Sequence, residues 1–148
     1  MTASPTIRPY QPSDKPAVLE LLRLNTPAYF SPEEEADLIF YLENEREDYF
    51  VIIVNEKVVG CGGINYSGKT GKISWDMLHP DYQNQGLGRK LLQFRISKLK
   101  ANPEIESVTV RTSQLAYGFY QKNGFKLTQT EKDYWAAGFD LYEMELEN

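Results

Sequence analysis

The sequence predicts an α/β (α+β) fold, with a central mixed, mostly antiparallel sheet of about seven strands flanked by about four helices. Three observations predict it. Strand-like and helix-like segments follow one another in the order βααβββαβαββ. Residues 49–78 hold three strand-like segments joined by short turns, which is typical of an antiparallel meander. A glycine-bearing loop then leads from the last of these strands into a helix.

The N-terminal part predicts one strand and two helices. A short strand is expected at residues 6–10. Ser13 or Asp14 can cap a first helix that residues 25–27 end, because Pro27 cannot continue it. Ser31 and Glu34 then have the spacing of a capping box, and the second helix is expected to reach about Asn44.

The remaining elements follow from apolar spacing and from turn residues between the segments. Gly124 is expected to end the last helix in a left-handed conformation. The predicted strands are residues 49–54, 58–66, 70–78, 107–111, 125–132 and 139–145, and the predicted helices are residues 86–100 and 115–123.

Composition indicates one soluble domain over residues 1–148. No apolar run reaches the length of about 20 residues that a membrane span needs, and the N-terminus has no apolar signal region. Cys61 is the only cysteine, so neither an internal disulfide nor a multi-cysteine metal site is expected. We therefore expect a cytoplasmic protein without a bound metal and without a membrane partner.

The formal net charge of −5 argues against nucleic acid as a partner, because phosphate backbones require clustered Lys and Arg. An acidic surface suits a cationic amine substrate. The same charge is equally explained by solubility.

The most informative segment is the loop of residues 83–89, Gln-Asn-Gln-Gly-Leu-Gly-Arg. It connects a predicted strand to a predicted helix, so bare backbone N–H groups at the helix start can bind a phosphate. Gly86 and Gly88 have no Cβ and allow a bulky anion to approach the main chain. The loop lacks the Lys-Ser/Thr ending of a Walker loop and the third glycine of the dinucleotide fingerprint.

Two motifs resemble those of the GNAT family of acyl-CoA N-acyltransferases. The loop is similar to the family signature Gln/Arg-x-x-Gly-x-Gly/Ala, with Gln83, Gly86 and Gly88 at its fixed positions. Residues 116–125 resemble the second signature, Ala-x-x-Phe-Tyr-x-Lys-x-Gly-Phe, at every fixed position. The two motifs occur in the family's order, and the resemblance covers nearly the whole chain.

The resemblance implies acetyl-CoA as co-substrate. The loop amides would bind its pyrophosphate, and the backbone of the strand ending at Leu78 would pair with the pantetheine arm. A main-chain N–H of Met77 or Leu78 would stabilise the oxyanion. Ser113 stands where the family often has an Asn that contacts the cofactor. The expected cofactor-binding residues are Met77, Leu78, Gln83, Asn84, Gln85, Gly86, Leu87, Gly88, Arg89, Lys90 and Ser113.

Tyr120 is the candidate general acid. A phenol with an unperturbed pKa of about 10 stays protonated at neutral pH and can protonate a thiolate, whose thiol has a pKa of about 8.5. The family's Tyr at this position commonly bonds the cofactor sulfur. Without the motif, a core tyrosine beside Tyr117 and Phe119 would be the simpler interpretation.

The general base is less clearly marked. Some family members carry a Glu where this chain has Lys72, and Asp76 would share a face with Lys72 in a regular strand. Asp76 either orients or deprotonates the amine, or is a solvated strand residue. His79 precedes Pro80 in a turn, which favours a surface role, and Cys61 has no base beside it in the sequence.

The acceptor pocket is expected between the connection of the first two helices and the last hairpin. Tyr29 and Phe30 on one side, and Tyr134 and Trp135 on the other, are the candidate substrate-binding residues. The same rings could instead only pack against one another.

The sequence thus favours an N-acetyltransferase that moves an acetyl group from acetyl-CoA directly to a primary amine of a small molecule, an amino acid or a peptide. One alternative is a non-catalytic acyl-CoA-binding or sensing module of the same fold, and another is an interaction protein that keeps only the fold. A homodimer formed through the C-terminal strands is a further possibility.

Overall fold

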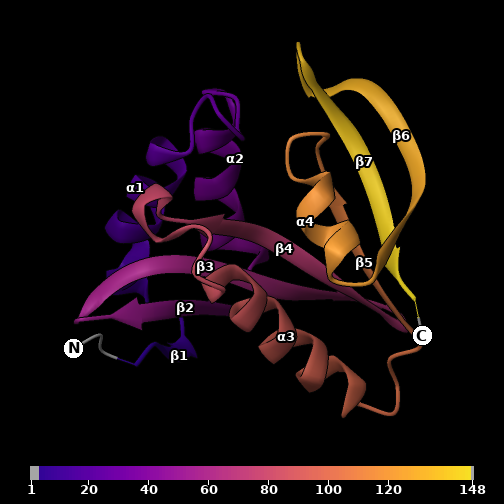
Figure 1. Cartoon of the computed structure of the whole chain (residues 1–148), viewed down its shortest axis with the longest axis horizontal. Coiled ribbons are helices and arrows are strands. Elements are labelled where there is room, and N and C mark those ends of the chain that lie inside the picture. The colour runs from indigo at the N-terminus through magenta and orange to yellow at the C-terminus, as the bar shows by residue number, and fades with distance from the viewer. Residues whose placement is uncertain (1–3, 148) are drawn as a thin grey trace.

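A computed structural model describes residues 4–147, and its centre is one seven-stranded sheet in the order β1-β2-β3-β4-β5-β7-β6 (Figure 1). Only β4 and β5 pair in parallel, and all other neighbours are antiparallel. The predicted fold class is confirmed. The strands are β1 Thr6–Pro9, β2 Asp48–Val54, β3 Lys57–Ser67, β4 Thr70–Leu78, β5 Ser107–Thr112, β6 Phe125–Ala136 and β7 Phe139–Leu146.

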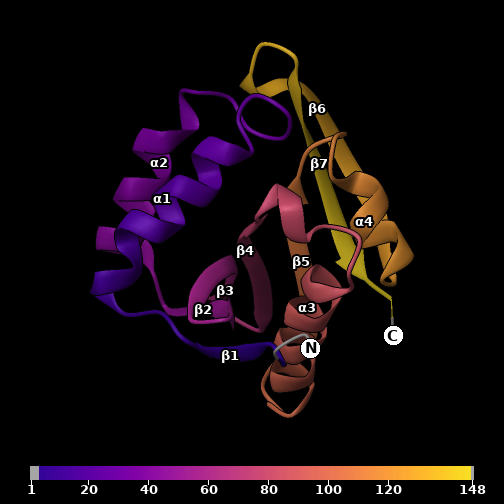
Figure 2. The same ribbon diagram turned by 60° about the vertical axis from the view of Figure 1, so that its left-hand side comes forward.

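Helices cover both faces of the sheet (Figure 2). One apolar core lies under α1 and α2, and a second lies between the sheet and α3 with α4. The side chains alternate accordingly, since in β2 Tyr49 and Val51 join the first core and Phe50 joins the second. The helices are α1 Lys15–Leu24, α2 Glu34–Phe40, α3 Leu87–Lys100 and α4 Tyr117–Lys122.

One predicted helix is only partly α-helical, and one predicted strand boundary is wrong. The second helix is α-helical to Phe40 and continues as a π-helical turn, Tyr41–Glu45, in which Tyr41 and Leu42 are buried. Strand β6 continues to Ala136, whereas we expected it to end at Lys132. Asp133 forms a bulge with φ 54°, and its backbone N–H donates to Asp140 Oδ1 at 2.9 Å.

The feature of the sheet that matters most for function is a bulge in β4. Gly63 pairs with Ser74 and Cys61 pairs with Met77, so two residues of β4, Trp75 and Asp76, stand opposite Gly62 alone. Trp75 has a left-handed backbone with φ 49°. The extra residue reverses the alternation of side chains beyond it, so Asp76 points toward α3 and α4.

Strands β4 and β5 pair over only part of their length. Their last paired residues are Ile73 and Val110, although β4 continues to Leu78. Within residues 4–147, no strand pairs with this side of β4 after Ile73. The backbone of residues 74–78 therefore has an open edge on the side of β5.

Gly62 makes the bulge possible, and its substitution tests this. A Cβ on Gly62 would collide with Asp76 Oδ1 and would lie 2.8 Å from Arg95 Cζ. We expect Gly62→Ala to lower the free energy of unfolding by about 1–3 kcal/mol, the usual cost of overpacking. Urea unfolding followed by circular dichroism measures this.

The matched control is Gly118→Ala, because a Cβ at Gly118 in α4 meets no atom within 4 Å. Alanine favours a helix over glycine, so this variant should keep or slightly raise stability. Equal losses in the two variants would contradict the account of Gly62.

Candidate active site

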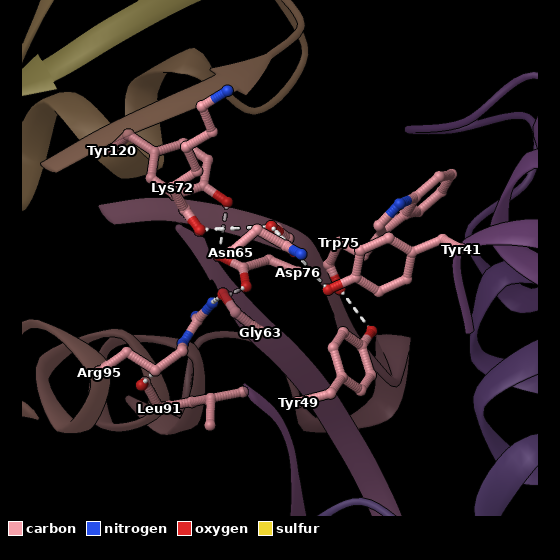
Figure 3. A network of polar contacts seen from close by, with 11 residues as sticks. Tyr41, Tyr49, Gly63, Asn65, Lys72, Trp75, Asp76, Leu91, Arg95 and Tyr120 are labelled. Atoms are coloured by element: carbon pink, nitrogen blue, oxygen red, sulfur yellow. Dashed lines mark hydrogen bonds and ion pairs between the residues drawn. The ribbon is translucent and has the colours of Figure 1, made fainter. Parts of the chain in front are cut away.

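The centre of the site is a hydrogen bond between Tyr120 and Asp76. Tyr120 comes from α4, after β5, and its hydroxyl donates to Asp76 Oδ2 of β4 at 2.6 Å (Figure 3). This bond joins β4 to the element after β5 in the region where the two strands no longer pair. The two residues predicted to be catalytic are thus in direct contact.

Burial keeps Tyr120 protonated. Its side chain is buried, and burial, together with the charge of Asp76 and the hydrogen bond to it, raises the pKa of Tyr120 well above its ordinary value of 10.0. The phenol therefore stays protonated near neutral pH and is able to donate a proton.

Arg95 of α3 holds the other oxygen of Asp76. Its Nη1 lies 2.5 Å from Asp76 Oδ1, and the Arg95 side chain is 1% exposed, against 17% for Asp76 (Figure 3). Arg95 also donates to the carbonyl oxygens of Gly63 at 3.0 Å and Leu91 at 3.2 Å. Burial opposes its charge, but the charge of Asp76 and the contact with it outweigh this and raise the pKa of Arg95. The guanidinium is therefore permanently charged.

The bulge corrects one expectation about Asp76. We expected it to share a face with Lys72, as in a regular strand. Lys72 pairs with Asn65, whose side chain bonds Tyr41 on the face of α1 and α2, whereas Asp76 bonds Arg95 and Tyr120 on the opposite face. Lys72 and Asp76 therefore lie on opposite faces of the sheet.

Aromatic residues hold the bulge from the face of α1 and α2. The Tyr49 hydroxyl donates to the Trp75 carbonyl oxygen at 2.8 Å. The ring of Phe30, in the connection between α1 and α2, stacks on Trp75 with centroids 6.1 Å apart. Phe30, a predicted substrate-binding residue, thus lies on the face of β4 opposite to Asp76, while its neighbour Tyr29 is 37% exposed.

A polar network continues along this face. The Tyr41 hydroxyl donates to Asn65 Oδ1 at 2.6 Å, and the Ser74 hydroxyl donates to the same oxygen at 2.8 Å. Asn65 Nδ2 donates to the carbonyl oxygen of Glu45 at 2.8 Å. These bonds connect β3, β4 and the π-helical turn beside Trp75 (Figure 3).

The glycine loop has the geometry of an anion site. Gly86, with φ 80°, stands directly before α3, and a Cβ there would meet no atom within 4 Å. The first N–H groups of a helix have no intrahelical acceptor, so those of Leu87, Gly88 and Arg89 are available. Arg89 and Lys90 are exposed next to them. The space and the donors fit a phosphate group.

Side chains of the loop fasten it to the protein. The buried Leu87 packs against β2 and β3. Gln85 Nε2 donates to the Asp81 carbonyl oxygen at 3.3 Å, and Gln83 Nε2 donates to Asn25 Oδ1 at 3.4 Å. Asn84 has φ 63° and is exposed. The loop amides are thus presented by a fixed backbone.

Asn25 links this loop to the end of β4. It is buried at the end of α1, and its Nδ2 donates to the carbonyl oxygens of Leu21 at 2.8 Å and Leu78 at 3.0 Å. One side chain therefore couples the first helix, the open part of β4 and the glycine loop.

Of the remaining predicted cofactor residues, Met77 lies in the open part of β4 and Ser113 directly follows β5. Met77 is buried in the core of α1 and α2, and its backbone pairs with Cys61. Ser113 is buried at the end of β5, and its hydroxyl accepts a hydrogen bond from the Leu115 N–H at 3.2 Å. This bond leaves the Ser113 hydroxyl proton free to donate to another group.

Tyr134 and Trp135 form a cluster with Arg111 at the end of the β6–β7 hairpin. The Tyr134 hydroxyl accepts a hydrogen bond from Arg111 Nη2 at 2.8 Å, and the guanidinium lies 4.9 Å from the centroid of the Tyr134 ring. Trp135 Nε1 donates to the Thr112 carbonyl oxygen at 3.0 Å. The hairpin tip and the connection between α1 and α2 lie at the same end of the molecule, at the top of both views (Figures 1 and 2).

The surroundings of His79 and Cys61 indicate structural rather than catalytic roles. His79 Nδ1 accepts a hydrogen bond from the Asp81 N–H at 3.1 Å and so caps the turn after β4. Burial raises the pKa of the Cys61 thiol to about 12, so it is not a nucleophile.

Across residues 4–147 the structure contains no group of three His, Cys, Asp or Glu side chains placed to hold a metal ion, and no helix there is long and apolar enough to cross a membrane.

Sequence reasoning missed Arg95, Asn25 and Gly62. A signal for Arg95 was present, since it occurs four residues after Leu91 and four before Leu99, on the buried stripe of α3. A charged residue on such a stripe needs a buried partner. Gly62, within Gly60-Cys61-Gly62-Gly63, indicated close approach of another group to β3.

Comparison with known proteins identifies the family. The model of the acetyltransferase (GNAT) domain matches residues 28–148, and the chain belongs to this family. The predicted family, and with it the class of acyltransferases, is confirmed. The amino-acid acetyltransferase of Pasteurella multocida is 32% identical over 136 residues, which cover 87% of this chain and 29% of that protein. The chain thus spans less than a third of that relative's length.

Solved structures share the fold. The ribosomal-protein alanine N-acetyltransferase of Escherichia coli has a TM-score of 0.80 at 22% identity, over 97% of this chain and 93% of that one. A GNAT acetyltransferase from Elizabethkingia anophelis, solved with acetyl-CoA bound, has a TM-score of 0.71 at 23% identity, over 97% and 98% of the two chains.

The buried ion pair predicts an unusual pattern of stabilities. Asp76→Asn leaves the Arg95 charge buried without a counter-ion and should lower the free energy of unfolding by about 3–5 kcal/mol. The double variant Asp76→Asn/Arg95→Met removes both charges and should be more stable than Asp76→Asn alone. Urea unfolding of the three proteins measures this.

Glu35→Gln provides the control, since Glu35 pairs with Arg23 at 2.8 Å on the surface. This variant should lose little stability. A double variant no more stable than Asp76→Asn would show that the stability lost in Asp76→Asn does not come from an unpaired charge on Arg95.

Proposed function

We propose that this protein transfers an acetyl group from acetyl-CoA directly to a primary amine. The observation that carries the proposal is the contact of a buried, protonated Tyr120 with the carboxylate of Asp76 where β4 and β5 part. Acetyl-CoA supplies an activated thioester. A bond forms from the amine nitrogen to the acetyl carbon, the carbon–sulfur bond breaks, and the nitrogen loses a proton while the sulfur gains one.

The chain has groups suited to each part of the cofactor. The N–H groups at the start of α3, with Arg89 and Lys90 beside them, suit the pyrophosphate. The open edge of residues 74–78 suits the pantetheine arm, which can pair with the strand as an added extended segment. Backbone N–H groups near Met77 and Leu78 are candidates to stabilise negative charge on the thioester oxygen. Ser113 keeps a hydroxyl proton to donate to the cofactor.

The acceptor amine is expected to enter from the face of α1 and α2 and to reach the thioester and Asp76 at the open edge of β4. Phe30 and Trp75 border this side of β4, and Tyr134 and Trp135, packed against each other in β6, are the candidate residues of the hairpin. The Pasteurella relative is named for an amino acid and the Escherichia coli structure for a protein alanine. About a tenth of α-amino groups are neutral at pH 7, against far fewer lysine side chains, so an α-amine needs less help from a base. We infer that amino acids and peptide N-termini are the first acceptors to test.

The direct experiment has two stages. Calorimetry first measures binding of acetyl-CoA and CoA to the purified protein, and a thiol-release assay then screens amino acids, peptides that begin with alanine, and polyamines. Binding followed by amine-dependent thiol release is the expected result. Binding without release from any amine would favour a sensing module, and no binding would contradict the cofactor site.

Gly86 tests the phosphate site. Gly86→Val places a branched side chain in the open space before α3, and we expect it to weaken acetyl-CoA binding about tenfold or more. The measurement is the calorimetric Kd.

Gly138→Val is the matched control, because Gly138 has nearly the same φ, 83° against 80°, and equally open surroundings, but lies in the β6–β7 hairpin. It carries the same backbone strain and should bind acetyl-CoA normally. Equal weakening in both variants would mean that strain alone acts.

Tyr120 tests the proton donor. Tyr120→Phe keeps the ring and removes the hydroxyl, so the turnover number should fall about 100-fold or more while the Kd for acetyl-CoA changes little. Steady-state kinetics and calorimetry measure the two quantities. Tyr117→Phe, one turn earlier in α4, should retain full activity. A fully active Tyr120→Phe would exclude Tyr120 as the donor.

A further inference from the structure

The two oxygens of Asp76 have different partners. Oδ1 faces Arg95 Nη1 at 2.5 Å, and Oδ2 accepts the hydrogen bond of Tyr120 at 2.6 Å. Arg95 is fixed by two further bonds to the carbonyl oxygens of Gly63 and Leu91. The carboxylate therefore has one oxygen held by a permanent cation and one oxygen directed at a single hydroxyl (Figure 3).

Ionisation of Tyr120 is tied to the charge of Asp76. A phenolate at this position would lie within 2.6 Å of a carboxylate, and two anions so close in a buried site are strongly disfavoured. The single positive charge of Arg95 balances only one of them. Tyr120 can therefore release its proton readily only when Asp76 gains one.

The neighbouring ionisable groups cannot take over this task. Tyr49 and Cys61, which lie near Asp76, are both buried, and burial raises the pKa of Tyr49 well above 10.0 and that of Cys61 to about 12. Both remain neutral near pH 7. The proton carriers of the cluster are Asp76 and Tyr120.

We propose that Asp76 and Tyr120 act as one proton relay, with Arg95 as the residue that positions Asp76. Asp76 Oδ2 takes the proton that the amine nitrogen loses, and Tyr120 gives its hydroxyl proton to the departing sulfur. The proton on Asp76 then passes to the Tyr120 oxygen along the existing hydrogen bond. One proton leaves nitrogen, one reaches sulfur, and both residues return to their initial states. This inference rests on the proposed acetyl transfer.

A relay differs from an independent acid and base in how the rate losses of the two single variants combine in the double variant. Single-turnover rates are measured for the wild type, Asp76→Asn, Tyr120→Phe and the double variant, at saturating acetyl-CoA and amine. Each single variant should be about 100-fold slower, and the double variant no slower than either, because residues that act as a unit are lost together. Losses that multiply in the double variant would overturn the relay.

Arg95 is tested in two backgrounds. Arg95→Met should lower the rate in the wild type but not further in Asp76→Asn, since its role is exerted through that carboxylate. A purely structural role would lower the rate in both. Arg95→Lys, which keeps the charge, serves if Arg95→Met does not fold, and the same comparison applies to it.

A measurement without cofactor tests the coupling separately. The protein carries tyrosine labelled with carbon-13 at Cζ, and the Tyr120 signal is assigned by its loss in Tyr120→Phe. In Asp76→Asn, this signal should titrate at lower pH than in the wild type, because the neighbouring charge is removed. An unchanged titration would overturn the relay. Wild-type protein that releases no thiol with any amine would instead overturn the proposed function itself.

Discussion

The buried pair of Arg95 and Asp76 is the constraint around which the centre of the molecule is arranged. A charge on the apolar stripe of α3 is acceptable only if a counter-ion meets it there, and β4 in regular pleating would not direct Asp76 to that face. The bulge at Trp75 turns the strand, and Gly62 leaves room for both side chains. The same distortion coincides with the end of pairing between β4 and β5. The buried ion pair thus occurs together with both the contact of Tyr120 with Asp76 and the open edge of β4 beside it.

The two faces of the sheet contribute differently to the site. On the face of α3 and α4, a fixed ion pair, a buried phenol and a fastened loop form a rigid set of groups suited to a cofactor that does not vary. On the other face, aromatic side chains come from the connection of α1 to α2 and from the bulge of β4. Connections tolerate change better than strands and helices. The variable part of the proposed site is therefore expected in the connection between α1 and α2.

Much of the fold could be predicted because its signals are local. Residues 116–125 and the glycine loop have side chains whose types are dictated by backbone conformation and close approach, and both motifs occur where expected. The faces of β4 could not be predicted in this way. Ile73, Trp75 and Met77 alternate as if they shared one face, yet Ile73 lies in the core of α3, and Trp75 and Met77 lie in that of α1 and α2. The cause is a pairing with Gly62 on another strand, which no periodicity within β4 records.

For the same reason, only one of the two partners of Asp76 could be predicted from the sequence. Tyr120 was found through its motif, whereas Arg95 is distant in sequence and is joined to Asp76 only by the packing of α3 on the sheet. Asn25 is a similar case, since its bonds to Leu78 and Gln83 cross more than fifty residues. Long-range polar contacts of this kind depend on tertiary packing rather than on local sequence.

The claim on which this account depends is that the cofactor lies along the open edge of β4 and at the start of α3. Hydrogen–deuterium exchange with and without CoA tests it most directly, because newly bonded backbone amides exchange more slowly. The account predicts added protection in residues 74–78 and 84–89, with little change in β1, β2 and the exposed side of α2. Tight binding of CoA without protection in residues 74–78 would contradict the account.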